Sequence, residues 1–84
     1  MEPHWSDYGG KNTLRVDVGG HTFWWSYKQL VAFRAPGHPQ VIRQNEWSQT
    51  TAKHLNLIDG GRVKERVDAT TFKRLLGELV PRFE

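Results

Sequence analysis

The sequence contains no cysteine among its 84 residues. This absence excludes a disulfide framework and any thiolate metal site, so nothing indicates a small secreted protein held together by disulfides. Long hydrophobic runs are also missing, since none approaches the roughly 18 apolar residues that a membrane span requires. Residues 1–12 lack the basic segment and apolar run of a signal peptide. We therefore expect a cytoplasmic protein with no membrane association.

The sequence also lacks the residue spacings of known metal and catalytic sites. Its histidines have no H-x-x-H or H-E-x-x-H spacing, and no G-x-S-x-G motif marks a nucleophile. Gly20-His21 before a predicted strand is weakly similar to the single-histidine ribonuclease toxins, but the helix that precedes the histidine in that family is absent here. We expect no enzymatic activity, no metal and no cofactor. The four histidines fall in four separate segments, at His4, His21, His38 and His54.

Charge of one sign is not strongly in excess, because 12 Lys and Arg stand against nine Asp and Glu, for a net charge of +3. This balance permits nucleic acid or an acidic protein as a partner without requiring either. A chain of this length has a marginal core, which the four Trp, four Phe and two Tyr help to fill. We expect a flexible N-terminal tail over residues 1–12 and a single small domain over residues 13–84, with a homo-oligomer as an open alternative.

Apolar residues recur with a period of two from Thr13 onward, as in a half-buried strand. The pattern predicts strands at Thr13–Val18 and His21–Tyr27. Gly19-Gly20 between them can supply the positive φ angles of a two-residue hairpin turn.

This turn would place Val16 opposite Phe23, with every large apolar side chain of the two strands except Trp24 on one face. Trp24 would lie on the outer face opposite Arg15. There it is either covered by the guanidinium group or exposed as a stacking platform.

The rest of the chain predicts two helices and further strands. We expect an α+β domain, with a four- to five-stranded, mainly antiparallel meander sheet and two short helices on its apolar face. Ser48 and Asp68 are the expected helix N-caps. The predicted elements are strands at Leu30–Arg34 and Gln40–Trp47, a helix at Gln49–Ile58, a strand at Arg62–Val67 and a second helix that ends before Pro81.

The first candidate binding surface is a basic stripe formed by Arg62, Lys64 and Arg66, with Lys73 and Arg74 nearby. On a strand, the three cations of the stripe would share one side at spacings of about 6.6–7 Å. Clustered cations of this kind contact phosphate backbones. A charged face on an edge strand is equally the ordinary protection against edge-to-edge aggregation.

The second candidate surface lies where the fourth strand gives way to the first helix. Trp47, Lys53, His54 and Asn56 could form a polar patch with an aromatic anchor, of the kind that recognises a protein or a nucleotide. The alternative is structural, with Trp47 in the core and Lys53 in solvent.

Several short motifs together resemble a family of short uncharacterised proteins from tailed-phage genomes and related bacterial or archaeal elements. The resemblance covers roughly residues 14–80 and implies a mobile-element origin, and it transfers no catalytic residue. Ala52 stands where the family usually has glycine. The motifs are Trp25-Ser26-Tyr27, Val31-Ala32-Phe33-Arg34, Asn45-Glu46-Trp47, Thr50-Thr51-Ala52-Lys53-His54-Leu55-Asn56 and Asp59-Gly60-Gly61.

Small size, spare aromatic residues and this resemblance favour a non-enzymatic accessory protein that binds and inhibits or redirects a host macromolecular machine. The partner would be a host protein or ribonucleoprotein complex in the host cytoplasm, and an anti-CRISPR or other anti-defence inhibitor is the most concrete form. The alternative is a small DNA- or RNA-binding module that uses the basic stripe and exposed aromatic residues.

Overall fold

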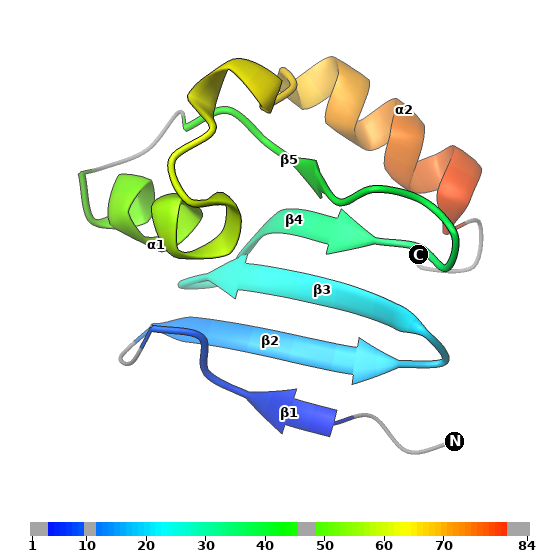
Figure 1. The fold of residues 1–84 in the computed structure, drawn as a ribbon, viewed down its shortest axis with the longest axis horizontal. Coiled ribbons are helices and arrows are strands. Elements are labelled where there is room, and N and C mark those ends of the chain that lie inside the picture. The colour runs from blue at the N-terminus through cyan, green and yellow to red at the C-terminus, as the bar shows by residue number, and fades with distance from the viewer. Residues whose placement is uncertain (1–3, 10–11, 46–48, 81–84) are drawn as a thin grey trace.

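The chain folds into five strands followed by two α-helices, in a computed structural model that describes residues 4–9, 12–45 and 49–80. The strands lie in the sheet in chain order and each pairs antiparallel with the next, so the sheet is a meander (Figure 1). The predicted α+β class and antiparallel meander are confirmed. The strands are β1 (His4–Ser6), β2 (Thr13–Val18), β3 (His21–Ser26), β4 (Gln29–Arg34) and β5 (Val41–Ile42).

The hairpin of β2 and β3 has the predicted register. Gly19 and Gly20 form its turn with φ angles of +59° and +81°, a region that L side chains rarely adopt. Val16 pairs with Phe23 and Arg15 pairs with Trp24, as expected. The diglycine turn and the alternating pattern therefore determine the centre of the sheet.

The two ends of the sheet differ from the prediction. Residues 4–6, which fall within the predicted tail, form β1, and Trp5 pairs there with Val16 of β2. At the other end, the fourth strand predicted over Gln40–Trp47 is much shorter, because β5 covers only Val41–Ile42. Part of the remainder, residues 46–48, lies outside the described residues.

The segment after the sheet contains α1 (Gln49–Asp59), the 3₁₀ helix η1 (Val63–Glu65) and α2 (Ala69–Leu79). Asp68 caps α2 as predicted, since its Oδ1 accepts a hydrogen bond of 2.8 Å from the backbone N–H of Thr71. The predicted cap of α1, Ser48, lies outside the described residues. No helix in the described part of the chain is long and apolar enough to cross a membrane.

The strand predicted at Arg62–Val67 is wrong. Residues 63–65 form η1 instead, and only Val67 joins the sheet, through a parallel bridge with Arg43 next to β5. The alternation of valine with charged residues also suits an exposed turn, and Val63 is indeed exposed.

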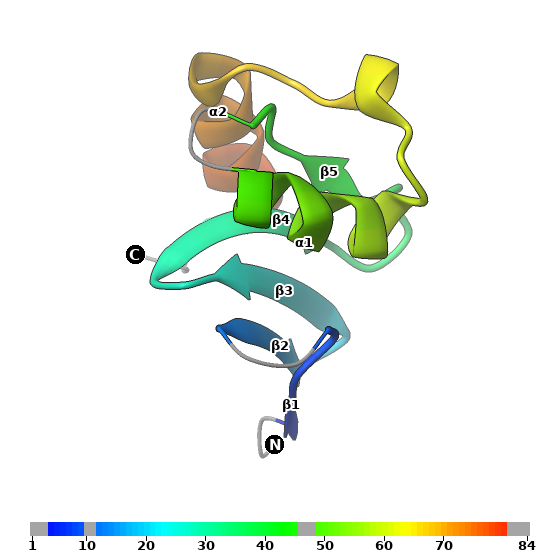
Figure 2. The same ribbon diagram turned by 90° about the vertical axis from the view of Figure 1, so that its left-hand side faces the viewer.

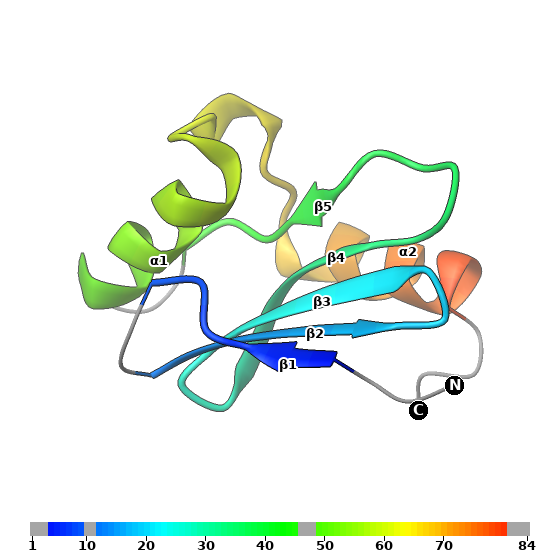
Figure 3. The same ribbon diagram turned by 60° about the horizontal axis from the view of Figure 1, so that its bottom comes forward.

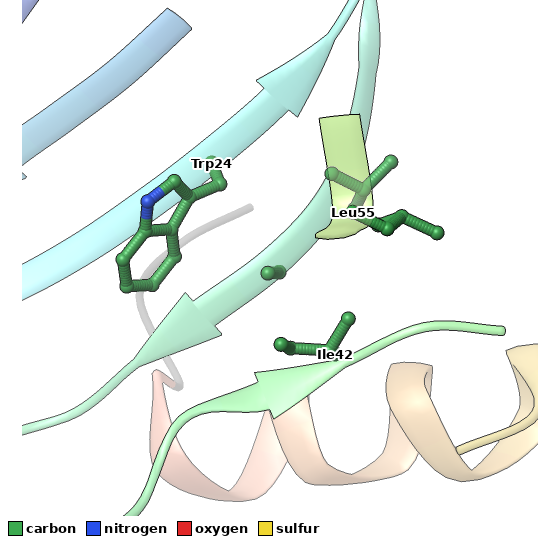
Figure 4. Close-up of a cluster of buried hydrophobic side chains, with 5 residues drawn as sticks. Trp24, Ile42 and Leu55 are labelled. Carbon is green, nitrogen blue, oxygen red and sulfur yellow. The ribbon is translucent and has the colours of Figure 1, made fainter. Parts of the chain in front are cut away.

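The placement of both helices on one face is also wrong, because α1 and α2 pack on opposite faces of the sheet (Figures 2 and 3). On one face, Leu55 of α1 packs with Trp24 and Ile42, and Figure 4 shows these three side chains grouped together. On the other face, Phe72 of α2 packs against Phe33 at a ring-centroid distance of 5.4 Å. Adjacent residues of a strand point to opposite faces, so apolar side chains of both parities give the sheet two cores.

Candidate functional site

His54, a residue of the predicted polar patch, points into the protein. Its side chain is buried between α1 and β3, where Nδ1 lies 2.6 Å from Oγ of Ser26. Thr51, one helical turn earlier, accepts a hydrogen bond of 3.3 Å from the same Ser26 hydroxyl. Three buried polar side chains thus satisfy one another where α1 meets the sheet.

Aromatic rings enclose this cluster. The ring of His54 lies 6.2 Å from that of Tyr8 and 5.9 Å from that of Tyr27, measured between centroids. Burial lowers the pKa of His54 below its ordinary value of about 6.5, because a buried imidazolium loses its hydration. Ser26 has only 1% of its surface exposed. The pair is therefore enclosed by the protein, and it holds α1 against β3.

Asn56, another residue of the patch, contributes to a second structural contact. Arg66 forms a two-pronged ion pair with Asp59, with Nε 2.8 Å from Oδ2 and Nη2 2.9 Å from Oδ1, and Nη2 also donates to Oδ1 of Asn56 at 2.9 Å. Burial alone would raise the pKa of Asp59, but hydrogen bonds from Arg66 and from the backbone of Gly61 and Arg62 hold it below its usual range. This ion pair fixes the end of α1 to the segment after η1.

The predicted basic stripe is therefore dispersed. Arg66 is buried in the ion pair, whereas Arg62 and Lys64 are exposed on the turn of η1. Arg62 lies 3.9 Å from Glu65, which partly neutralises it. Gly61 already donates its backbone N–H to Asp59, so this loop does not offer that amide to a phosphate. Because η1 replaces the predicted strand, the interpretation of these cations as protection of a sheet edge is also wrong.

Trp24 is not an exposed platform. It is buried in the α1-side core, and the guanidinium carbon of Arg15 lies 5.5 Å from its ring centroid, which is the covered alternative. Arg15 also binds Asp17, lowering the pKa of that carboxylate through a hydrogen bond of 3.0 Å. Polar groups thus cover β2 on this face. Of the other predicted site residues, Lys53 is exposed and Trp47 lies outside the described residues.

The opposite face of the sheet carries a feature that the sequence analysis missed. An apolar groove with a volume of about 860 Å³ runs along β2 and β3 beside α2. Trp5 of β1 lines one side and Val80, just after α2, lines the other. The side chains along β2 and β3 are Leu14, Val16, Val18, Phe23 and Trp25.

Three further side chains line the groove near the strand ends. His21 stacks on Phe23, with ring planes 6° apart, and Tyr27 and Lys28 lie at the turn between β3 and β4. No acidic residue is among the described residues that line the groove. The described part of the chain also holds no group of three or more side chains suited to a metal ion.

The groove follows from the way the helices divide between the faces. The apolar sides of β2 and β3 form one continuous surface, and α2 alone packs on it because Ser26, Thr51 and His54 hold α1 on the other face. Trp5 is 59% exposed and Tyr27 is 50% exposed on this surface. A sequence signal was present, since the large apolar residues of β2 and β3 other than Trp24 share one parity and so form one continuous surface.

The chain matches no curated protein and no solved structure. One family model matches it from Trp5 in β1 to Arg74 in α2, a range that includes α1 and the groove side chains of β2 and β3. By this match over residues 5–74, the chain belongs to a family of unknown function (DUF8033).

Proposed function

We propose that this protein is a non-enzymatic binding protein that holds an apolar segment of a partner protein in the groove beside α2. The observation that carries the proposal is the open apolar surface of β2 and β3, left by α1 packing on the opposite face. Contiguous exposed apolar surface is costly in water, so a surface of this kind on a small domain favours an interaction site.

The aromatic side chains at the sides of the groove support a protein partner. Trp5 and Tyr27 are large, half-exposed rings that line the groove from two different segments, β1 and the turn between β3 and β4. Rings of this type anchor protein interfaces, because each buries a large area with few rotatable bonds.

Two features support a binding role over catalysis. The buried Ser26–His54 pair packs against α1 and is not among the described residues that line the groove, although Tyr27 contacts His54 and also lines the groove. Among the described residues that line the groove, the titratable side chains are His21, Tyr27 and Lys28, and the others form a nearly continuous apolar surface. This composition is suited to holding a ligand.

The biological role that we propose is that of a phage-type accessory protein that binds and inhibits or redirects a host machine, for instance in anti-defence. Small size and the resemblance of the short motifs to proteins of mobile elements support this part of the proposal. Several motif residues, including Ser26, His54, Asn56 and Asp59, form the internal contacts of α1. The motifs thus mark the fold, and the groove is where a partner would be recognised.

Affinity capture with two matched variants tests the proposal. Trp5→Glu places a charge at the groove, whereas Leu57→Glu places one on α1, and the two original side chains are exposed to the same extent, 59% and 57%. We expect host proteins retained by the native protein at physiological salt to be lost with Trp5→Glu and kept with Leu57→Glu, with both variants folded by circular dichroism. Equal retention by the two variants contradicts a role for the groove.

A further inference from the structure

We infer that the occupant of the groove is an acidic amphipathic α-helix of about three to four turns that lies beside α2 as a second helix on the same face of the sheet. This inference rests on the proposed function and adds the shape and charge of the partner segment. Three features support it, namely the dimensions of the uncovered surface, its lack of polar groups, and the positive charge of Lys28 near one end.

The dimensions of the uncovered surface suit one helix. The groove is lined from β1 to β3, which is about 10 Å across two strand spacings. The six-residue strands β2 and β3 extend about 20 Å. An α-helix is about 10 Å wide, and about 13 residues of it span 20 Å. The apolar surface continues under α2, so the occupant would pack against both the sheet and Val80.

The lack of polar groups in the groove favours a helix over an extended peptide. A strand lying across this surface would bury N–H and C=O groups that need partners. The side chains that β2 contributes to the groove are apolar, and so are Phe23 and Trp25 of β3. They offer almost no hydrogen-bond partners. A helix satisfies its backbone groups internally and presents only side chains to the surface.

Charges near the groove favour an acidic occupant. Lys28 lies at the β3–β4 turn and is the one lysine or arginine among the described residues that line the groove. No acidic side chain is among the described lining residues to neutralise this positive charge. Glutamates flanking the apolar stripe of a helix would meet Lys28 directly.

A second copy of this chain does not offer such a helix in its described part. The exposed face of α2 carries Lys73, Arg74 and Glu78. Apart from the groove residues, the exposed large apolar side chains are Leu57 and Val63, which belong to separate elements. Neither makes an apolar stripe, so the occupant comes from a different protein.

Three labelled peptides of about 13 residues test the inference by fluorescence anisotropy. The first carries leucine at helical spacing with glutamate between, and a lactam between one lysine and one glutamate side chain holds it helical. The second has the same composition in strict alternation, and the third keeps the lactam and the helical order but replaces every other glutamate with lysine. We expect the acidic helix to bind at least about tenfold more tightly than either of the others.

Variants locate the binding. Trp5→Glu and Lys28→Glu are both at exposed positions and should each weaken binding of the acidic helix about tenfold, whereas Leu57→Glu should not change it. Backbone amide chemical shifts should move along β2 and β3. Equal binding of the alternating or basic peptide, or shifts confined to α1, overturns the inference.

The outcome also separates this inference from the proposed function. If Trp5→Glu abolishes capture of a host protein but the acidic helix does not bind, the groove is the site and its occupant is not an acidic helix. If Trp5→Glu changes neither capture nor peptide binding, both proposals fail.

Discussion

The Oγ of Ser26 lies 2.6 Å from Nδ1 of His54, and this contact joins β3 to α1 in the interior of the protein. Ser26 and Trp24 have the same parity on β3, so the contact places α1 on the face of Trp24. The opposite face, with Val16 and Phe23, is left to α2. A buried polar pair on one face thus accounts for the open apolar groove on the other.

The first prediction concerns the dependence of stability on pH. Because burial lowers the pKa of His54, the unfolded chain takes up a proton at a higher pH than the folded one. The contribution of neutral His54 to stability is fully present above its ordinary pKa of about 6.5 and is lost as pH falls from there toward the lower pKa of the folded state. Urea unfolding between pH 7.5 and 5.5 should show stability decreasing with acidification.

Two histidine variants provide the control. His54→Gln should reduce this pH dependence, whereas His38→Gln, at an exposed loop position, should leave it unchanged. Tyr8, the ring in edge contact with His54, has its pKa raised by burial to about 12 and stays neutral throughout the range. An unchanged slope in His54→Gln would assign the effect to another group.

The second prediction concerns the ion pair between Arg66 and Asp59. Arg66→Leu should lower the free energy of unfolding by about 3–5 kcal/mol, because it leaves a buried carboxylate without a counter-charge. Lys64→Leu, two residues away and exposed, should change it by less than about 0.5 kcal/mol. Denaturant unfolding measures both.

A double variant separates the charge from the packing. Asp59→Leu combined with Arg66→Leu removes both buried charges, so it should be less destabilised than Arg66→Leu alone. A double variant that is less stable than Arg66→Leu would mean that Asp59 stabilises the fold without Arg66, for which the hydrogen bond from the backbone of Gly61 is an available contact.

The centre of the sheet could be predicted from sequence because two local signals agree there. The alternation in β2 and β3 needs the register that Gly19-Gly20 imposes, and a shift by one residue would bury Arg15 and Asp17 in place of Val16. The N-cap of α2 is equally local, since Asp68 needs only the amide of Thr71.

The candidate site could not be predicted in the same way, because it depends on contacts distant in sequence. Arg66 has the alternation of a strand residue, and only the position of Asp59 in three dimensions explains why its side chain is buried. His54 and Asn56 look like surface polar residues until Ser26 and Arg66 are placed beside them. Strand β1 was missed because three residues carry too short a pattern.

The third prediction compares two glycines with positive φ angles. Gly37 has φ +77° and open space around it, so Gly37→Ala should cost only the backbone strain of about 1–2 kcal/mol. Gly20 has φ +81°, and a Cβ there would lie 3.1 Å from Cγ of Pro36. Gly20→Ala should therefore be the more destabilising of the two in denaturant unfolding. Equal costs would mean that Pro36 moves aside freely.

The fourth prediction contrasts two tryptophans on opposite faces. Trp24→Ala should lower the free energy of unfolding by about 3–5 kcal/mol, because it leaves a cavity between Leu55 and Ile42. Trp5→Ala should cost less than about 1 kcal/mol, because its side chain is already half in solvent.

Binding of the acidic helical peptide should show the reverse order when each protein is assayed under conditions where it is folded. Trp5→Ala loses an aromatic anchor of the groove, whereas Trp24 lies on the other face and does not line it. If folded Trp24→Ala weakened peptide binding as much as Trp5→Ala, the α1 face would be part of the binding site. The assignment of binding to the α2 face alone would then be wrong.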